Sequence, residues 1–423
     1  MEKEILVSIW CITYNHEPYI REAIEGFLAQ KTDFRYEIII HDDASTDKTA
    51  EIIKEYEHKY PQLIHGIYEA ENQYRKNISD ISWLMNIEQE YCRGKYIALC
   101  EGDDCWIDCH KLQIQADYME SHSDCALSLH NALQLNCQDG TMKAVDPFDG
   151  NKERNISSEE IIMQYKGHPP TASVFYKREL IEMPDFFHKT PVGDYPLLLY
   201  GFTKGKVYYD SRIMSVYRWL SAGSYNERLT LNKEMEFYFD MGLIAFLVQY
   251  DEFTDYKYHV WISNRIQQFA SRAISAVDLK IPLKKYYEKC KKHGYYLAIE
   301  CGDYLDRMEY LRKQIFDMAY CSERTRNFVR KFKNIIIMGK GNYGTIVARQ
   351  FKKNEIEFCG FAVSHKMKGE GFFMGKPVWE LAKLPFSKEN TGVIVAINPL
   401  RWDDISESLN GAGIIHYTCP FLF

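Results

Sequence analysis

Three carboxylates, Glu101, Asp103 and Asp104, follow directly on an apolar run in the segment YIALCEGDDCW. Ionised carboxylates at neighbouring positions repel one another, so a chain that gathers them needs a partner that relieves the repulsion. A hard divalent cation such as Mg²⁺ or Mn²⁺ is such a partner, because these ions prefer oxygen ligands. The segment therefore predicts a divalent-metal site at the end of a buried strand.

Two further polar groups end apolar runs earlier in the chain. The first is Thr13, Tyr14 and Asn15, and the second is His41, Asp42 and Asp43. An aromatic ring can stack on a nucleobase, and a carboxylate can accept a hydrogen bond from a base N–H. In an open α/β sheet, ligands bind outside the carboxyl ends of the strands. We therefore expect both groups on one rim with the acidic segment, where a metal would neutralise a diphosphate.

Alternating strands and helices must position these groups over the first hundred residues. Apolar residues at helical spacing, such as Ile20, Ile24 and Phe27, separate the apolar runs that are typical of buried strands. This alternation predicts parallel βαβ units with helices on both faces of the sheet. The expected strands are 5–15, 36–43, 63–69 and 95–104, and the expected helices are 17–30, 45–60 and 78–92.

The remaining chain divides into three stretches of different character. Residues 111–218 mix short strands, among them TASVFYK and KVYYDSRIMSVYR, with Pro- and Gly-rich loops that we expect at a substrate face. Residues 229–331 show helical periodicity and predict a helical connector that serves as a packing or homo-oligomer surface. A last α/β unit begins at NIIIMGKGNYG. The expected regions are therefore 1–228, 229–331 and 332–423.

Three segments together resemble the family 2 glycosyltransferases of the GT-A fold. They are VSIWCITYNHEPYIREAIEGFLAQ, YEIIIHDDASTDKT and GKYIALCEGDDCW, in this order and at this spacing. The resemblance covers about residues 4–220, is specific as a set of three motifs, and implies a nucleotide-sugar donor. The expected fold class is thus α/β: a GT-A type mixed sheet that binds a nucleotide sugar, the helical connector, and a small C-terminal Rossmann-like domain.

The resemblance implies roles for the polar groups. Thr13 to Asn15 and the pair Asp42 and Asp43 match positions that contact the nucleobase in the family. Asp103 matches a ribose contact, and Asp104 matches the ligand of the metal on the diphosphate, with Mn²⁺ or Mg²⁺ expected. Structural alternatives remain. Asp42 and Asp43 could be turn and N-cap residues, Tyr14 a surface aromatic, and Asp103 and Asp104 a solvated loop.

The segment GDYPLLLYGFTKGKVYYDSRIMSVYR resembles the part of the family that carries the catalytic base, which falls on Asp194. In an inverting displacement this carboxylate takes the proton of an acceptor hydroxyl as the oxygen attacks the anomeric carbon. A helix N-cap ahead of YPLLLYGF is the structural alternative for Asp194. We interpret His168, in GHPPTAS, as a loop histidine with satisfied partners, and a place at the acceptor as its alternative.

One position departs from the family. Many relatives carry a histidine just after a tyrosine-arginine pair near the end of the catalytic domain, available to metal or phosphate. Here Trp219 and Leu220 follow Tyr217 and Arg218. Arg218 is therefore expected either as a bidentate phosphate donor or in a structural ion pair.

A second motif, G-x-G-x-x-G, lies in the last α/β unit at Gly339, Gly341 and Gly344, after an apolar strand and before a helix. Glycines in this context allow a tight turn and a close approach of the backbone to a phosphate. The next strand ends in Ser364 and His365, where an acidic ribose contact is expected for NAD. We therefore predict a Rossmann-like module, similar to those appended to some bacterial glycosyltransferases. The sequence does not identify its ligand.

Composition limits the classes of binding partner and the cellular compartment that we expect for this protein. The net charge of −7 and the pI near 6 argue against nucleic acid as a partner. The chain begins MEKEILVSIW, unlike a secretory signal, and no apolar run approaches the roughly 20 residues that span a bilayer. Twelve cysteines scattered along the chain fit reduced thiols. These features predict a cytoplasmic protein without a transmembrane segment, either free or peripheral at the inner face of the membrane.

The leading prediction is an inverting, metal-dependent glycosyltransferase. It would move a sugar, most simply from a UDP-sugar, to a hydroxyl of a glycan or glycoprotein in bacterial surface glycan synthesis. One alternative is a non-catalytic protein that binds a nucleotide sugar or acts as a scaffold. A second is a nucleotidyltransferase, which usually carries a glycine-rich, basic loop after its first strand. The loop here, TYNHEPY, has neither feature.

Overall fold

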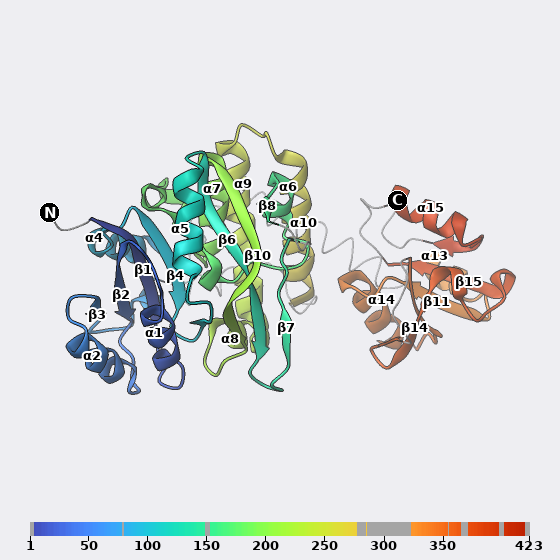
Figure 1. The fold of residues 1–423 in the computed structure, drawn as a ribbon. Helices are drawn as coiled ribbons and strands as arrows, with labels where there is room; N and C mark the ends of the chain where they lie inside the picture. The colour runs from blue at the N-terminus through green and yellow to red at the C-terminus, as the bar shows by residue number, and fades with distance from the viewer. Residues whose placement is uncertain are drawn as a thin grey trace. The chain divides into compact units, whose positions relative to one another are not determined.

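The computed structural model describes residues 4–77, 80–148, 153–276, 285, 323–353, 355–364, 371–396 and 402–418. Its strands form two sheets, one that ends with Trp219 and one that begins at Asn334 (Figure 1). Among the described residues, no helix combines the length and apolar character that a membrane crossing requires.

The first sheet begins with four parallel strands in the order β3-β2-β1-β4. Parallel pairing brings the carboxyl ends of these strands to one edge, as the sequence predicts. Four helices connect them, and the apolar face of the first, which includes Ile20, Ile24 and Phe27, is buried in the core of the sheet. The strands are β1 Ile5–Thr13, β2 Arg35–Asp42, β3 Ile64–Tyr68 and β4 Tyr96–Glu101, and the helices are α1 Ile20–Leu28, α2 Thr49–Lys59, α3 Gln73–Lys76 and α4 Ser82–Tyr91.

The second half of this sheet makes it mixed. Strand β9 (Phe175–Lys177) lies antiparallel between β4 and β6 (Cys125–Asn136), and β6 pairs in parallel with β10 (Lys206–Trp219). Short strands complete it: β5 Cys105–Trp106, β7 Met142–Ala144 and β8 Arg154–Asn155. The helical segments here are α5 Lys111–Ser121, α6 Ser158–Met163, α7 Asp194–Lys204, and the 3₁₀ turns η1 Thr171–Ser173, η2 Arg178–Ile181 and η3 Asp185–Phe187. The predicted mixed α/β fold class is thereby confirmed.

One expected strand is shorter than the sequence suggested. The segment TASVFYK forms a 3₁₀ turn at Thr171–Ser173 before the strand begins at Phe175. The prediction of a continuous strand was wrong. Ser173 closes a turn on Pro170, because its backbone N–H and its hydroxyl both donate to the Pro170 carbonyl, at 2.8 and 2.7 Å.

Helices follow the first sheet: α8 Tyr225–Leu231, α9 Lys233–Phe253 and α10 His259–Ala276. The rings of Phe246 and Tyr250 on α9 lie 5.4 and 6.0 Å from that of Phe187 in η3. The described start of the predicted connector is therefore helical and packs on the region of the first sheet. Most of the rest of the predicted connector lies outside the described residues, which resume at 323 with α13 (Glu323–Val329), and the boundaries at 228 and 331 stay predictions.

The second sheet has the order β13-β14-β12-β11-β15-β16, and only β13 runs antiparallel to its neighbour. It is a small, mostly parallel α/β sheet of the kind expected after residue 332. Its strands are β11 Asn334–Met338, β12 Gly360–Val363, β13 Gly371–Phe373, β14 Lys376–Glu380, β15 Thr391–Val395 and β16 Tyr417–Thr418. Its helical segments are α14 Asn342–Lys353, α15 Trp402–Gly411, η4 Leu381–Lys383 and η5 Lys388–Asn390.

Candidate active site

The acidic segment lies where β4 ends beside β1. The backbone N–H of Gly102 donates to the Ile12 carbonyl at 2.9 Å, which ties the two strand ends together. A Cβ at residue 102 would stand 2.8 Å from the Cβ of Thr13 and 2.9 Å from Nδ1 of His16. Only glycine fits so close an approach, so Gly102 lets the acidic segment pack against the end of β1.

Asp104 is almost fully buried, with 1% of its surface exposed. Its Oδ1 accepts a hydrogen bond from the backbone N–H of Arg218 at 2.8 Å, whereas its buried Oδ2 has no partner. Burial, and then the charges of Asp103 and Glu101, raise the pKa of Asp104 well above its usual value. An unpartnered oxygen among carboxylates is a donor set that fits a hard divalent cation.

Asp103 is fixed from two sides. Its Oδ2 accepts a hydrogen bond from the hydroxyl of Ser221 at 2.7 Å, and its Oδ1 lies 3.9 Å from Nε2 of His16. Ser221 follows Leu220, whose backbone adopts φ +59°. This turn after β10 carries a serine to the acidic segment, close to where many relatives place a histidine.

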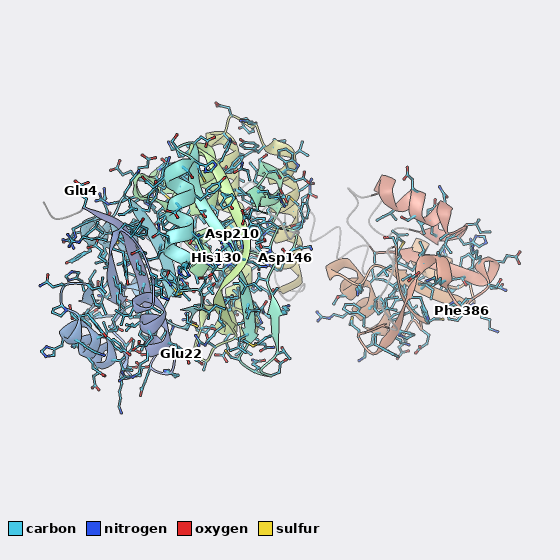
Figure 2. All side chains as sticks on the ribbon, viewed as in Figure 1. Glu4, Glu22, His130, Asp146, Asp210 and Phe386 are labelled. Carbon is cyan, nitrogen blue, oxygen red and sulfur yellow. The ribbon has the colours of Figure 1, made fainter. Side chains whose placement is uncertain are left out.

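Arg218 points into the protein. Its Nη1 donates to the backbone carbonyl of Asp103 at 2.6 Å, its guanidinium pairs with Glu22, and it lies over the ring of Tyr19 at 5.1 Å. Only 7% of Arg218 is exposed. Of its two predicted roles, the structure gives the ion pair. Figure 2 shows Glu22, on α1, at the end of the parallel strands that lies opposite to Glu4, the residue before β1.

The loops after β1 and β2 are joined by hydrogen bonds that involve their side chains. Asp42 accepts hydrogen bonds from the hydroxyl of Ser45 at 2.5 Å and from its backbone N–H at 3.1 Å. The same hydroxyl accepts from the backbone N–H of Asn15, and Oδ1 of Asn15 accepts from the N–H of Thr46 at 2.7 Å. Asn15 has φ +57°. Asn15 and Asp42, both predicted at the nucleobase, are therefore linked through Ser45, and Asn15 is also bonded to Thr46.

Asp43 and Tyr14 complete this group. Both oxygens of Asp43 accept backbone N–H groups at the start of α3, from Gln73 at 2.6 Å and from Tyr74 at 3.1 Å. The ring of Tyr14 lies under the guanidinium of Arg75 at 5.9 Å. Asp43 thus links the loop after β2 to the start of α3, and its nucleobase contact stays a prediction.

Asp194 begins α7, and its charge acts on Glu101 of the acidic segment. Its Oδ2 lies 2.9 Å from Nε2 of His168, and its Oδ1 accepts the backbone N–H of Tyr195 at 2.7 Å. Burial acts to raise the pKa of Asp194, but the charge of His168 and these hydrogen bonds outweigh it and hold the pKa below its usual value. Asp194 is 25% exposed at its side chain, so an incoming hydroxyl can reach it.

Glu101 connects the two acidic regions. Burial raises its pKa to about 8, with further contributions from the charges of Asp103 and Asp194. Burial raises the pKa of the Tyr217 phenol as well, and the same carboxylates add to the shift. The structure therefore brings together Glu101, Asp103, Asp104 and Asp194, from β4, its following loop and α7.

His16, His168 and Ser221 were not predicted as site residues. His168 was assigned to its own loop, but it contacts both Gln164, at 3.2 Å, and Asp194. His16 stands next to Asn15 in the first motif, and that neighbourhood was the available signal for it. Nothing in the local sequence pointed to Ser221.

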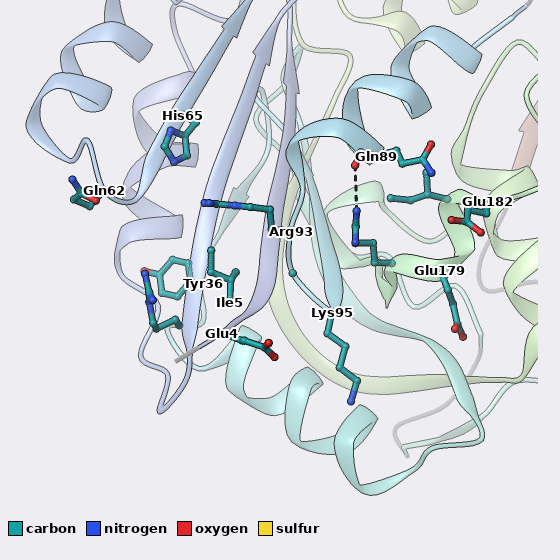
Figure 3. Close-up of a pocket in the computed structure, with 14 residues that line it drawn as sticks. Glu4, Ile5, Tyr36, Gln62, His65, Gln89, Arg93, Lys95, Glu179 and Glu182 are labelled. Carbon is teal, nitrogen blue, oxygen red and sulfur yellow. Dashed lines mark hydrogen bonds between the residues drawn. The ribbon is translucent and has the colours of Figure 1, made fainter. Parts of the chain in front are cut away.

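A cavity of about 860 Å³ lies at the amino ends of the first strands, away from the acidic segment (Figure 3). Its lining includes Glu4 and Arg35, from the starts of β1 and β2, and Arg93 and Lys95, from the turn before β4. Nε of Arg93 donates to the buried carboxylate of Glu37 at 2.9 Å. The cavity is therefore separate from the candidate active site.

The glycines of the second motif lie in the second sheet. Gly339 follows β11 with φ +108°, and a Cβ on Gly344 would stand 2.0 Å from the Gly339 carbonyl oxygen. A Cβ on Gly341 would meet nothing within 4 Å. Two of the three glycines are thus required by the turn and by close helix packing. Ser364 is described, and His365 lies outside the described residues.

Residues 8–134 match the family model described as glycosyl transferase family 2. An uncharacterized protein of Mycobacterium tuberculosis is 38% identical over 174 residues, which are 41% of this chain and 47% of the relative. The putative teichuronic acid biosynthesis glycosyltransferase TuaG of Bacillus subtilis is 36% identical over 136 residues, which are 32% of this chain and 50% of TuaG. The chain thus spans about half the length of these curated relatives.

Solved structures show more distant likenesses. Residues 1–349 of S. aureus TarS in complex with UDP-GlcNAc are 16% identical at a TM-score of 0.44, covering 69% of this chain and 90% of that one. The mannosyltransferase PcManGT from Pyrobaculum calidifontis in complex with GDP-Man and Mn²⁺ is 13% identical at a TM-score of 0.41, covering 74% and 87%. Likenesses at this level assign no ligand to the present chain.

Proposed function

We propose that this protein is an inverting, metal-dependent glycosyltransferase, because residues 8–134 match the family model described as glycosyl transferase family 2. It transfers a sugar from a nucleotide-sugar donor, a UDP-sugar in the first instance, to a hydroxyl of a glycan or glycoprotein. The similarity to TuaG, whose name refers to teichuronic acid biosynthesis, supports an acceptor in bacterial surface glycan synthesis.

One observation carries the proposal: two carboxylates with opposite environments flank one site. Asp104 has a buried oxygen without a partner, whereas Asp194 is paired with His168 and is partly exposed. Pairs of titratable groups whose surroundings shift their pKa values apart are typical of sites that divide tasks between them. We assign Asp104 to the metal and Asp194 to the acceptor proton.

The metal would be held by Asp104, with Asp103 at the ribose. A divalent cation bound there stabilises the negative charge that develops on the departing diphosphate. Asp103 is already oriented by the hydroxyl of Ser221, and Asp104 by the backbone of Arg218. These contacts hold the two carboxylates in fixed positions, so little ordering remains to be done when the donor binds.

The base step uses Asp194. As the acceptor oxygen forms its bond to the anomeric carbon, the bond from that carbon to the diphosphate oxygen breaks, and the hydroxyl proton passes to the carboxylate of Asp194. Attack opposite the leaving group inverts the anomeric centre. His168 keeps Asp194 ionised before this step, because its contact favours the charged form of the carboxyl group.

The test is incubation of the protein with a panel of nucleotide sugars and Mn²⁺. We expect slow hydrolysis of one donor without acceptor, and tight binding of the matching nucleoside diphosphate. Binding without hydrolysis or transfer to any glycan would favour the non-catalytic alternative. Failure to bind any nucleoside diphosphate would overturn the proposal.

A further inference from the structure

Three consecutive side chains of different chemistry meet in the turn between β5 and α5. They are Asp108, Cys109 and His110, and one ligand atom from each lies within 4.8 Å of the other two. In the described part of the chain, this is the one place where three such side chains gather so closely. A carboxylate, a thiol and an imidazole are the side-chain groups that bind transition metals in proteins.

The separations between these atoms are close to those of ligands on one ion. Nδ1 of His110 lies 3.4 Å from Sγ of Cys109 and 3.8 Å from Oδ1 of Asp108. Zinc binds nitrogen and oxygen at about 2.0–2.2 Å and sulfur at about 2.3 Å, so at tetrahedral angles its ligand atoms lie roughly 3.3 to 3.6 Å apart. Small side-chain rotations therefore suffice to close the three groups on an ion.

The contact between Cys109 and His110 is the metal-free form of a ligand pair. With the ring proton on Nε2, the thiol of Cys109 donates to Nδ1 of His110. A divalent cation that replaces this thiol proton is bound by the thiolate and by the Nδ1 lone pair, and one proton is released to solvent. The thiolate and the carboxylate of Asp108 then balance the two charges of the cation.

Neighbouring chain holds the backbone of this turn. After α1, the N–H of Lys31 donates to the Cys109 carbonyl at 2.8 Å, and Nε2 of Gln30 donates to the Asp108 carbonyl at 2.9 Å. Oδ1 of Asp108 also accepts the N–H of His110 at 2.8 Å. A carboxylate has about four lone-pair positions, so it can accept this bond and still bind an ion. Little conformational freedom is lost when an ion binds to a turn that is already fixed.

The turn is separate from the acidic segment of the candidate active site. Arg218, which bonds to that segment, pairs with Glu22 in the first turn of α1. Cys109 instead bonds to Lys31, beyond the last turn of α1. The helix has nine residues and is therefore roughly 13 Å long. The two places thus lie at opposite ends of α1.

We propose that Asp108, Cys109 and His110 form a second metal site, which binds a transition-metal ion, zinc in the first instance. Sulfur and nitrogen ligands favour zinc, whereas the oxygen ligands of the acidic segment favour Mg²⁺ or Mn²⁺. Three protein ligands leave the fourth position of a tetrahedral ion to water. The side chains of Asp108 and His110 are 30% and 55% exposed, so the ion can enter from solvent.

The test is Co²⁺ substitution in the full chain after treatment with a chelator, with excess Mg²⁺ present to occupy oxygen-only sites. A bond from cobalt to a thiolate gives charge-transfer absorption in the near ultraviolet. We expect this band in the wild type, its loss when Zn²⁺ displaces the cobalt, and its absence in Cys109→Ser. His110→Gln should bind Co²⁺ at least about tenfold more weakly. Cys137→Ser, at another exposed cysteine, is the matched control and should keep the band.

Two outcomes of this experiment would overturn the second metal site. The first is a wild-type protein without the thiolate band, and the second is a band that persists in Cys109→Ser, because the ion would then be bound by another thiol. Melting curves give an independent readout. Zn²⁺ should raise the melting temperature of the wild type but not that of Cys109→Ser, and an equal rise in both would also contradict the site. None of these measurements depends on the proposed transfer reaction.

Discussion

Asp104 and Asp194 carry the same carboxylate side chain in two different environments. Asp104 follows β4, has a single backbone donor, and keeps a buried oxygen without a partner. Asp194 starts α7, faces an imidazole, and accepts a backbone N–H of its own helix. The pKa of the first is raised, chiefly by burial, and that of the second is lowered.

In the proposed mechanism, the position of each aspartate in the fold, and not its residue type, determines whether it binds the metal or takes the proton. The segment after β4 concentrates negative charge, because Glu101, Asp103 and Asp104 come from one short stretch of chain. The start of α7 meets a histidine from a distant loop instead. A carboxylate that lacks a cation can recruit a metal, whereas one that already has a partner can exchange a proton.

The largest expected effect comes from Asp104→Asn. The amide keeps the hydrogen bond from the Arg218 backbone but loses the charge that a metal requires, which is worth several kcal/mol of transition-state stabilisation. We expect metal-dependent transfer to fall by about 10³-fold or more, and the Mn²⁺-dependent affinity for UDP to fall with it. Titration calorimetry and a transfer assay measure the two. Metal-dependent transfer at the wild-type rate would contradict the assignment.

The same variant should be more stable without metal. A buried carboxylate without a partner is costlier than a neutral amide of the same shape. The expected result is a higher melting temperature for Asp104→Asn than for the wild type in the presence of a chelator. Asp43→Asn serves as the contrasting variant, because both oxygens of Asp43 accept backbone N–H groups, and it should be less stable than the wild type.

The second effect in size is that of Asp194→Asn. An amide cannot take the proton of the acceptor hydroxyl, and general-base catalysis contributes typically about 10²- to 10⁴-fold. We expect transfer to fall in this range while the affinity for UDP and Mn²⁺ stays at the wild-type value. Steady-state kinetics beside calorimetry separate the two quantities. Loss of UDP affinity to the extent seen in Asp104→Asn would erase the distinction between the two regions.

Much of the first sheet could be predicted because its pattern is local. Strands β1, β2 and β4 each contain an apolar run, amphipathic helices lie between the strands, and this alternation is visible in the sequence. Strand β6 was not predicted, although its first eight residues are buried. Ser128, His130 and Asn131 interrupt its apolar run, and its burial depends on pairing with β9 and β10, which are distant in the sequence.

The sequence predicted the carboxylates of the candidate site, but not the side chains that bond to them. Asp103, Asp104 and Asp194 belong to recognisable motifs. Ser221, which donates to Asp103, lies 118 residues away from it, and it reaches Asp103 through the turn after β10. Which side chain donates a hydrogen bond to a given carboxylate depends on such long-range contacts, and a single sequence does not reveal them.

A third, smaller effect tests the partner of Asp194. Replacing His168 with Gln removes the positive charge that lowers the pKa of Asp194, while the burial that raises this pKa remains. The pKa of Asp194 should rise, so the acid limb of kcat/KM should move to higher pH, with little change at alkaline pH. Transfer rates measured from pH 5 to 9 check this. His122→Gln, at an exposed histidine beside Tyr118, is the control and should leave the profile unchanged.

The smallest effect concerns Glu101, which lies between the two regions. Burial raises its pKa to about 8, so the folded protein binds a proton here that the unfolded chain releases near its ordinary pKa. Stability without metal should therefore fall as the pH rises from about 5 to 8. In Glu101→Gln this part of the slope should vanish, which urea denaturation at several pH values measures. An unchanged slope would mean that Glu101 is ionised in the folded protein, and that burial does not raise its pKa.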